Sequence, residues 1–260
     1  DIWGSAPNDV FAVGDNGTIL HFDGSTWARM SSGTSTALTR VWGASATEVY
    51  ATTGSAILHY DGSGWSPLTP PPPPPRGAVT VASTSAAIAV YETNSVTTND
   101  TLYVWNGDSW SVAATAIYLG VTFLGPDGRG AVGNRTIYPG LANDGTGWMA
   151  SSQFGYRAMA IIGKSFDDLF VQKSGLGTCC QLFHGGWQTP MGSAIAWYQP
   201  LWYVSNAEVY LRNNGHVYRI SSPLATSGTD EGIDAVAMWG SSSVDLFAVG
   251  ADGKIYHRAH

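Results

Sequence analysis

Lysine is scarce in this sequence, and so is charge of either sign. Only three of the 260 residues are lysine, 12% of the residues are charged, and the net charge is −7. Proteins that bind nucleic acid cluster Lys and Arg against the phosphates, so this composition argues against a nucleic-acid partner. No apolar run approaches the roughly twenty residues that a membrane-spanning helix needs, and we expect no membrane insertion.

Cysteine is almost absent, since Cys179 and Cys180 are the only two and they are adjacent. In a regular strand their side chains would point to opposite faces of the sheet. A disulfide between neighbours would need a distorted backbone. Two buried thiols at the start of a strand are one interpretation. The other is a vicinal disulfide that presents a rigid apolar plate to a ligand, which an oxidising, exported setting would favour.

Recognisable catalytic motifs are also missing. The sequence has no Gly-x-Ser-x-Gly elbow, no His-Glu-x-x-His and no phosphate-binding loop. The adjacent acids Asp167 and Asp168 do not form a glycosidase pair, because such carboxylates face each other across the substrate, about 5 to 9 Å apart. We therefore predict no catalytic residue, no cofactor and no metal site, which favours a protein that is not an enzyme.

What the sequence does contain is a repeat of about forty residues. In its clearest copy, the apolar runs 9–14 and 18–22 flank Asp15-Asn16-Gly17, and Asn-Gly favours a tight hairpin between antiparallel strands. Ile2-Trp3-Gly4 ends an earlier strand, and a last strand carries Trp27. Each copy therefore reads as a four-stranded antiparallel meander, the unit from which propeller blades are built.

Seven copies can be followed through the chain by a residue of their second strands: Phe11, Tyr50, Val90, Val132, Phe170, Tyr210 and Phe247. This spacing predicts an all-β fold, a single-domain β-propeller of seven blades with mostly four-stranded sheets. The copies occupy residues 1–36, 37–77, 78–116, 117–157, 158–195, 196–233 and 234–260. The seventh stops after its third strand, so we expect an incomplete last blade that keeps three strands or is completed by residues outside this chain.

Side chains that recur from copy to copy are expected to be structural. His21, His59 and His257 share a position on the third strand, where other copies carry residues as different as Val104 and Arg219. Repeats spread around a propeller cannot bring these imidazoles together on one zinc ion. Large flat tryptophans at one position of the fourth strand should wedge between neighbouring blades: Trp27, Trp65, Trp110, Trp148 and Trp187.

The motif W-G-S…D-V-F-A-V-G…G-T-I-L-H-F-D-G-x-x-W resembles the repeats of exported bacterial propeller proteins, and the stretch from Asp245 to Arg258 resembles a tectonin-type lectin repeat. The motif is also distantly similar to the Asp-box (BNR) repeat of sialidases, but Asp23 lies four residues before Trp27 rather than five, and no arginine triad is recognisable. The resemblance covers nearly the whole chain. It implies a secreted or cell-envelope protein, which the sparsely charged composition also favours, and we expect a chain already trimmed of any export signal. Related repeats serve lectins, assembly factors and enzymes alike.

The sixth copy departs most from the repeat, since Trp197, Tyr198 and Trp202 crowd the place where other copies carry Trp-Gly-x-Ser. Aromatic platforms beside polar groups are typical of sugar sites. With Cys179 and Cys180 these residues form our predicted ligand-binding surface, and extra core aromatics are the alternative. We expect a non-enzymatic, carbohydrate-binding or adhesive module, with a glycan or cell-surface protein as partner. The alternatives are a protein-interaction scaffold and a glycan-active hydrolase or lyase.

Overall fold

The structure is a computed structural model that describes most of the chain. The described residues are 1–69, 82–84, 87–91, 100–106, 108–116, 119–124, 129–134, 140–143, 148–151, 158–173, 180–184, 199–205, 208–221 and 228–259. Contacts divide the chain into two compact units: residues 1–115, 238–249 and 255–260 form the first, and residues 116–237 and 250–254 form the second. Within the described ranges no helix is long and apolar enough to cross a membrane.

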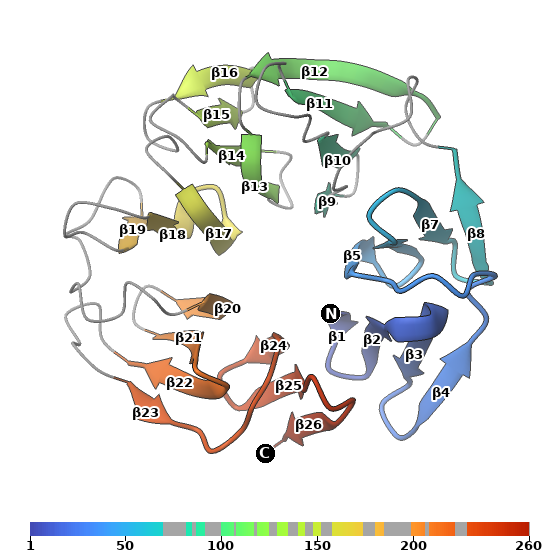
Figure 1. The fold of residues 1–260 in the computed structure, drawn as a ribbon, viewed down its shortest axis with the longest axis vertical. Coiled ribbons are helices and arrows are strands. Elements are labelled where there is room, and N and C mark those ends of the chain that lie inside the picture. The colour runs from blue at the N-terminus through green and yellow to red at the C-terminus, as the bar shows by residue number, and fades with distance from the viewer. Residues whose placement is uncertain are drawn as a thin grey trace. The chain divides into compact units, whose positions relative to one another are not determined.

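The first unit contains four sheets, each an antiparallel meander whose strands pair in chain order (Figure 1). The first copy forms β1 (Ile2–Ala6), β2 (Asp9–Gly14), β3 (Thr18–Phe22) and β4 (Trp27–Met30). The second forms β5 (Arg40–Ser45), β6 (Glu48–Thr52), β7 (Ile57–Tyr60) and β8 (Trp65–Leu68). The third forms β9 (Ala82–Thr84), β10 (Ala87–Tyr91), β11 (Asp100–Trp105) and β12 (Trp110–Ala116). The seventh copy forms β24 (Ala237–Ser242), β25 (Asp245–Val249) and β26 (Ile255–Arg258).

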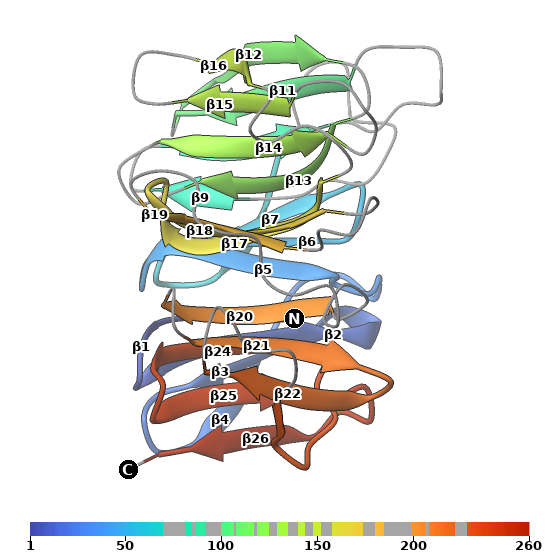
Figure 2. The ribbon, with the colours of Figure 1, turned by 90° about the vertical axis from the view of Figure 1, so that its left-hand side faces the viewer.

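The second unit contains the other three sheets, whose strands Figure 2 shows lengthwise. The fourth copy forms β13 (Leu119–Leu124), β14 (Gly130–Asn134), β15 (Gly140–Asn143) and β16 (Trp148–Ser151). The fifth forms β17 (Ala158–Ser165), β18 (Asp168–Lys173) and β19 (Cys180–His184). The sixth forms β20 (Gln199–Ser205), β21 (Glu208–Asn213), β22 (His216–Ile220) and β23 (Thr229–Asp230). Seven sheets thus appear among the described residues, one for each predicted copy, and the seventh has three strands there as expected.

Local turn chemistry explains the hairpins. Between β2 and β3 the chain makes a short 3-10 turn, η1 (Asp15–Gly17), in which Asn16 and Gly17 adopt the positive φ angles of 56° and 64°. Asn and Gly are the residues that tolerate this conformation best. The turn between β3 and β4 is held by Asp23, whose carboxylate accepts hydrogen bonds from the backbone amides of Ser25 and Thr26. Both turns were predictable because they depend on contiguous residues alone.

Neighbouring sheets of the first unit interlock through a tryptophan that covers a glycine. A Cβ added at Gly43 would lie 2.5 Å from Cη2 of Trp3, which belongs to the preceding sheet. A Cβ added at Gly4 would lie 2.8 Å from Cη2 of Trp239, so the first sheet carries the same contact with the seventh. Only glycine leaves room for the ring at this separation. The Trp-Gly pair of the first strand therefore joins one copy to the next.

The fourth-strand tryptophans also lie between sheets, as the sequence predicted. The ring centroid of Trp65 lies 6.0 Å from that of Phe11 in the preceding sheet, edge to face. Trp27 makes the same T-shaped contact with Phe247 of the seventh sheet, at 6.2 Å. Trp110 packs partly buried against the cluster that contains Tyr50 of the second sheet. The side chains of Trp148 and Trp187 lie outside the described residues.

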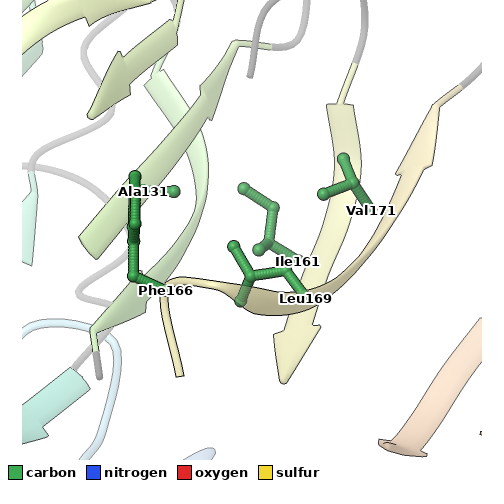
Figure 3. Close-up of a cluster of buried hydrophobic side chains, with 5 residues drawn as sticks. All are labelled: Ala131, Ile161, Phe166, Leu169 and Val171. Atoms are coloured by element: carbon green, nitrogen blue, oxygen red, sulfur yellow. The ribbon is translucent and has the colours of Figure 1, made fainter. Parts of the chain in front are cut away.

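A buried apolar cluster forms the core between the fourth and fifth sheets of the second unit (Figure 3). Leu169 and Val171 lie two residues apart on β18, so both side chains emerge on the same face of the sheet. Ile161 joins them from β17, and the cluster also includes Ala131 of β14 and Phe166. The positions that pack here are the apolar members of alternating strand patterns, which places the core between the sheets.

Candidate functional site

Three copies in the first unit build a network around an acid at the start of the second strand. In the first copy Ser5 Oγ donates to Asp9, and Nε2 of His21 lies 2.6 Å from the other carboxylate oxygen. The imidazole of His21 stacks on Phe11 with 4.3 Å between the ring centroids. The arrangement is repeated in the seventh copy, where Ser241 and His257 bind Asp245 at 2.7 and 2.9 Å.

This order of groups is not that of a nucleophilic triad. In a serine hydrolase the imidazole lies between the hydroxyl and the acid, so that it can take the hydroxyl proton. Here the carboxylate of Asp9 lies between Ser5 and His21, and an ionised carboxylate only accepts. The hydroxyl is therefore held as a donor to the acid, and the imidazole is not placed to take its proton. The histidines of this column thus contact an acid of their own copy, and their structural role stays a prediction.

The second copy contains a variant of the network built on glutamate. Glu48 Oε2 accepts a hydrogen bond from the hydroxyl of Tyr50 at 2.7 Å and lies 3.1 Å from Nε2 of His59. Burial raises the pKa of Tyr50 above its usual range, and the hydrogen bond to the charged Glu48 raises it further. The hydroxyl therefore stays protonated and continues to donate, which again describes a structural group.

In the second unit the acid of the fifth copy takes its partner from the sixth. Asp168 corresponds to Asp9, but Leu182 faces Phe170 where a histidine faces Phe11 in the first copy. The hydroxyl of Tyr203, on β20, donates to Asp168 at 2.5 Å. Burial, with the hydrogen bond to Asp168, raises the pKa of Tyr203 well above its usual range. Tyr203 is 2% exposed, so this bond is part of the contact between two sheets.

The predicted ligand surface is only partly described. Trp197, Tyr198 and Cys179 lie outside the described residues, and Cys180 begins β19 with its side chain outside them too. Trp202 is on β20, half-buried, and pairs with Tyr210 as Trp3 pairs with Phe11. Trp202 therefore occupies the same position as the sheet-joining tryptophans and is not an additional aromatic residue in the repeat. The adjacent Tyr203 is the true departure, since glycine holds that position after Trp3.

An open cleft of about 540 Å³ lies in the first unit beside the end of β4. It is lined by Gly17, Arg29, Met30 and the connection 31–35, which reads Ser-Ser-Gly-Thr-Ser. Gly17 lets this connection press against the hairpin, because a Cβ there would lie 1.9 Å from the carbonyl oxygen of Thr34. The buried Ser32 fastens the connection by donating to that carbonyl at 3.1 Å.

The chemistry of the cleft is that of a hydrogen-bonding surface with one cation. Arg29 is exposed and makes no ion pair within the part of the chain that the structure describes. Serine and threonine hydroxyls and one guanidinium can bind carboxylates and peptide groups. No aromatic side chain lines the cleft, so it offers no stacking platform to a sugar. Among the described residues, no three His, Cys, Asp or Glu side chains gather as a metal site would require.

Comparison with known proteins shows the fold and not a family. Neither a family model nor a curated protein matches this sequence. The structure resembles YCF48 from Cyanidioschyzon merolae, with 16% identity over 100% of this chain and 94% of that chain and a TM-score of 0.71. It also resembles YCF48 bound to D1 peptide, with 15% identity over 100% of this chain and 92% of that chain and a TM-score of 0.69.

A third similar structure is Hsv2 of Kluyveromyces lactis, with 10% identity over 96% of this chain and 88% of that chain and a TM-score of 0.60. Together with the antiparallel meanders, these neighbours show that the chain has a β-propeller fold, as its repeat predicts. The number of blades, and the division of the chain as a single domain, stay predictions.

Proposed function

We propose that this chain is a protein-binding module and that the cleft beside β4 contacts the partner. The observation that carries the proposal is Arg29, an exposed guanidinium without an ion pair among the described residues, at the wall of a cleft rich in hydroxyls. A protein segment supplies the matching groups, which are side-chain or terminal carboxylates and peptide carbonyls. A fold neighbour solved with a bound peptide gives independent support.

A sugar is a weaker fit to the same cleft, because pyranose faces are commonly bound by stacking on an aromatic ring. Carbohydrate binding remains the second candidate. It rests on the aromatic stretch of the sixth copy, of which Trp202 is the described member, half-buried in the position of a sheet-joining tryptophan. The resemblance of the repeat to those of exported proteins supports a role outside the cell or in the cell envelope, which fractionation of the source organism would test.

An enzymatic role has less support. The Ser, His and acidic side chains that recur in the first unit bind one another with the carboxylate in the middle. This order places no imidazole on the serine hydroxyl, unlike the arrangement in a serine hydrolase. We therefore propose binding without chemistry as the function of the module.

The test is a parallel screen of immobilised peptides and glycans against the purified chain. We expect peptides that carry an acidic residue or a free terminal carboxylate to be retained. Replacing Arg29 with alanine should lower the affinity for the retained peptides about tenfold, as expected for the loss of a charge-assisted hydrogen bond.

The matched control is Lys254→Ala, which removes the same charge from an exposed pair with Asp252 on the last hairpin, outside the cleft lining. Peptide binding that survives Arg29→Ala unchanged would contradict the cleft as the site. Retention of glycans but no peptide would replace the proposal with the carbohydrate function.

A further inference from the structure

The outermost strand of a sheet has one row of backbone N–H and C=O groups without a strand partner, and natural proteins usually protect such an edge. In the first unit β4, β8 and β12 each end a four-stranded sheet, and among the described residues each pairs with another strand on one side only (Figure 1). These three strands occupy the same place in their copies. They can therefore be compared position by position.

The position two residues after the fourth-strand tryptophan shows how each edge is treated. It holds Arg29 in β4, Pro67 in β8 and Val112 in β12. Charged residues and proline are two of the devices by which proteins oppose unwanted strand pairing. The third copy carries neither, and Val112 is 60% exposed.

The whole of β12 extends this difference. It spans seven residues, Trp110–Ala116, whereas β4 and β8 span four each. Its sequence, Trp-Ser-Val-Ala-Ala-Thr-Ala, contains no charge and no proline. At about 3.3 Å per residue it is about 23 Å long, enough for an extended segment to pair along it. The indole of Trp110 donates to the carbonyl of Thr69 at 2.8 Å and holds the start of the strand in place.

The direction of the free amides follows from the hairpin. The amide of Asn106 donates to the carbonyl of Ser109, so the backbone groups of Ser109 face β11. Successive residues of a strand direct their backbone groups to alternate sides. The amides of Trp110, Val112 and Ala114 therefore face away from β11. The equivalent position in β8 holds Pro67, which is consistent with an amide that serves no ladder.

We propose that β12 binds an uncharged, extended segment of a partner protein, which adds to the sheet as a fifth strand. This inference rests on the proposed protein-binding function and gives it a second contact site with a different chemistry. Backbone hydrogen bonds supply the affinity in such pairing, and alternate side chains supply the selectivity. A small or β-branched residue on the added strand would cover Val112. The absence of charge along β12 favours a segment that is also uncharged.

A second copy of this chain is the weaker occupant. Stable interfaces between folded proteins bury about 1,200 Å² or more in total. One strand edge of about 23 Å supplies only a small part of that area. The net charge of −7 on each copy also opposes association. An extended segment meets neither obstacle.

Two substitutions of Val112 test the proposal, because each introduces the residue that protects the same position in β4 or β8. Val112→Pro reproduces Pro67 and removes an outward amide, and Val112→Arg reproduces Arg29 and keeps that amide. The probe is a labelled, end-capped eight-residue peptide of alternating valine and serine, and its binding is followed by fluorescence anisotropy. We expect both variants to bind it about tenfold more weakly than the unchanged chain does. Met149→Arg, which charges another exposed apolar residue on an outermost strand, should bind it normally.

Melting curves show whether each Val112 variant folds. If one of the two does not fold, the other is used for the binding comparison. Equal binding by the unchanged chain and by a folded variant overturns the proposal, and so does failure of the unchanged chain to bind the probe. Size-exclusion chromatography tests the other occupant. If the unchanged chain is a dimer and Val112→Arg is a monomer, the occupant of the edge is a second copy of this chain, and the proposal is also overturned. The two Val112 variants should still retain acidic peptides at the cleft, because Val112 is not among the residues that line it, so failure here is separable from failure at the cleft.

Discussion

Replacing Gly43 with alanine should destabilise the first unit, because the added methyl would enter space that a tryptophan already fills. The new Cβ would lie 2.5 and 2.6 Å from Cη2 and Cζ3 of Trp3, and 2.9 Å from the carbonyl oxygen of Glu48. Trp3 is 6% exposed and stacks against Phe11, so its ring has little room to withdraw. The Glu48 contact is with backbone, which cannot rotate away as a side chain can.

The size of the effect follows from these distances. Overpacking a well-packed site costs about 1 to 3 kcal/mol. With one ring and one carbonyl both in the way, we expect the upper half of that range. A loss of about 2 to 3 kcal/mol lowers the melting temperature of a chain this long by roughly 4 to 12 °C. Gly14→Ala is the matched control, because nothing lies within 4 Å of its added Cβ and its φ of −171° is open to any residue.

A double-mutant cycle identifies the cause of the loss. Trp3→Ile removes the ring that the new methyl would meet, so Gly43→Ala should cost at least about 1 kcal/mol less in that background. Urea unfolding of the four proteins measures the coupling. If Gly43→Ala costs the same with and without Trp3, the tryptophan-on-glycine contact does not set the stability of this junction and the reasoning is refuted.

Three further predictions concern single side chains. Hydrogen bonds from the backbone amides of Thr26 and Ser25 lower the pKa of Asp23 to about 2. Because the unfolded carboxyl has the higher pKa, this stabilisation is complete above about pH 4 and is lost as the pH falls towards 2, so melting temperatures should drop there and Asp23→Ala should reduce the drop. Tyr203→Phe should cost about 1 to 3 kcal/mol in urea unfolding, because Asp168 loses a buried donor, and an unchanged midpoint would contradict this. Trp202→Ala should cost about 3 to 5 kcal/mol and leave peptide affinity unchanged, whereas lower affinity at an unchanged melting temperature would restore its role as a ligand platform.

The fold was predictable because its signals are local and repeated. The Asn-Gly and Asp-Gly turns fix hairpins through residues that are adjacent in sequence, and the apolar runs between them supply the strands. Strand register was predictable only where the loops are short. In the third copy Val90 pairs with Tyr103, so Tyr103 and not Val104 corresponds to His21, and the long insertion between the two strands hides this offset of one residue.

The candidate site was harder to predict because its contacts join residues far apart. Asp9 is the first residue of β2, yet it binds Ser5 and His21, which belong to two other strands of its sheet. A signal was present in the sequence, since an acid two positions before an aromatic recurs wherever the third strand carries histidine. The cleft left no signal, because it depends on how closely Gly17 lets a serine-rich connection approach the hairpin.

The fifth and sixth copies show why a departure from a repeat's consensus can have a structural cause. Tyr203 pairs with Val209 as Gly4 pairs with Val10, so it fills the glycine position of the sheet-joining contact. The preceding sheet carries Ile162 at the place of Trp3, since Ile162 pairs with Phe170 as Trp3 pairs with Phe11. Ile162 is smaller than tryptophan and Tyr203 is larger than glycine, so the two changes offset each other in volume, and volume-conserving changes are the ones that cores tolerate best.

Departures that offset each other in volume in this way indicate packing rather than a ligand. The exposed position held by Arg29, Pro67 and Val112 has no such partner to compensate it. Along an unpaired strand edge, arginine and proline each oppose pairing and an exposed valine permits it. In our proposal, variation at that edge changes what the molecule binds while its core stays as it is. The search for a partner of this propeller should therefore begin at the edge of β12.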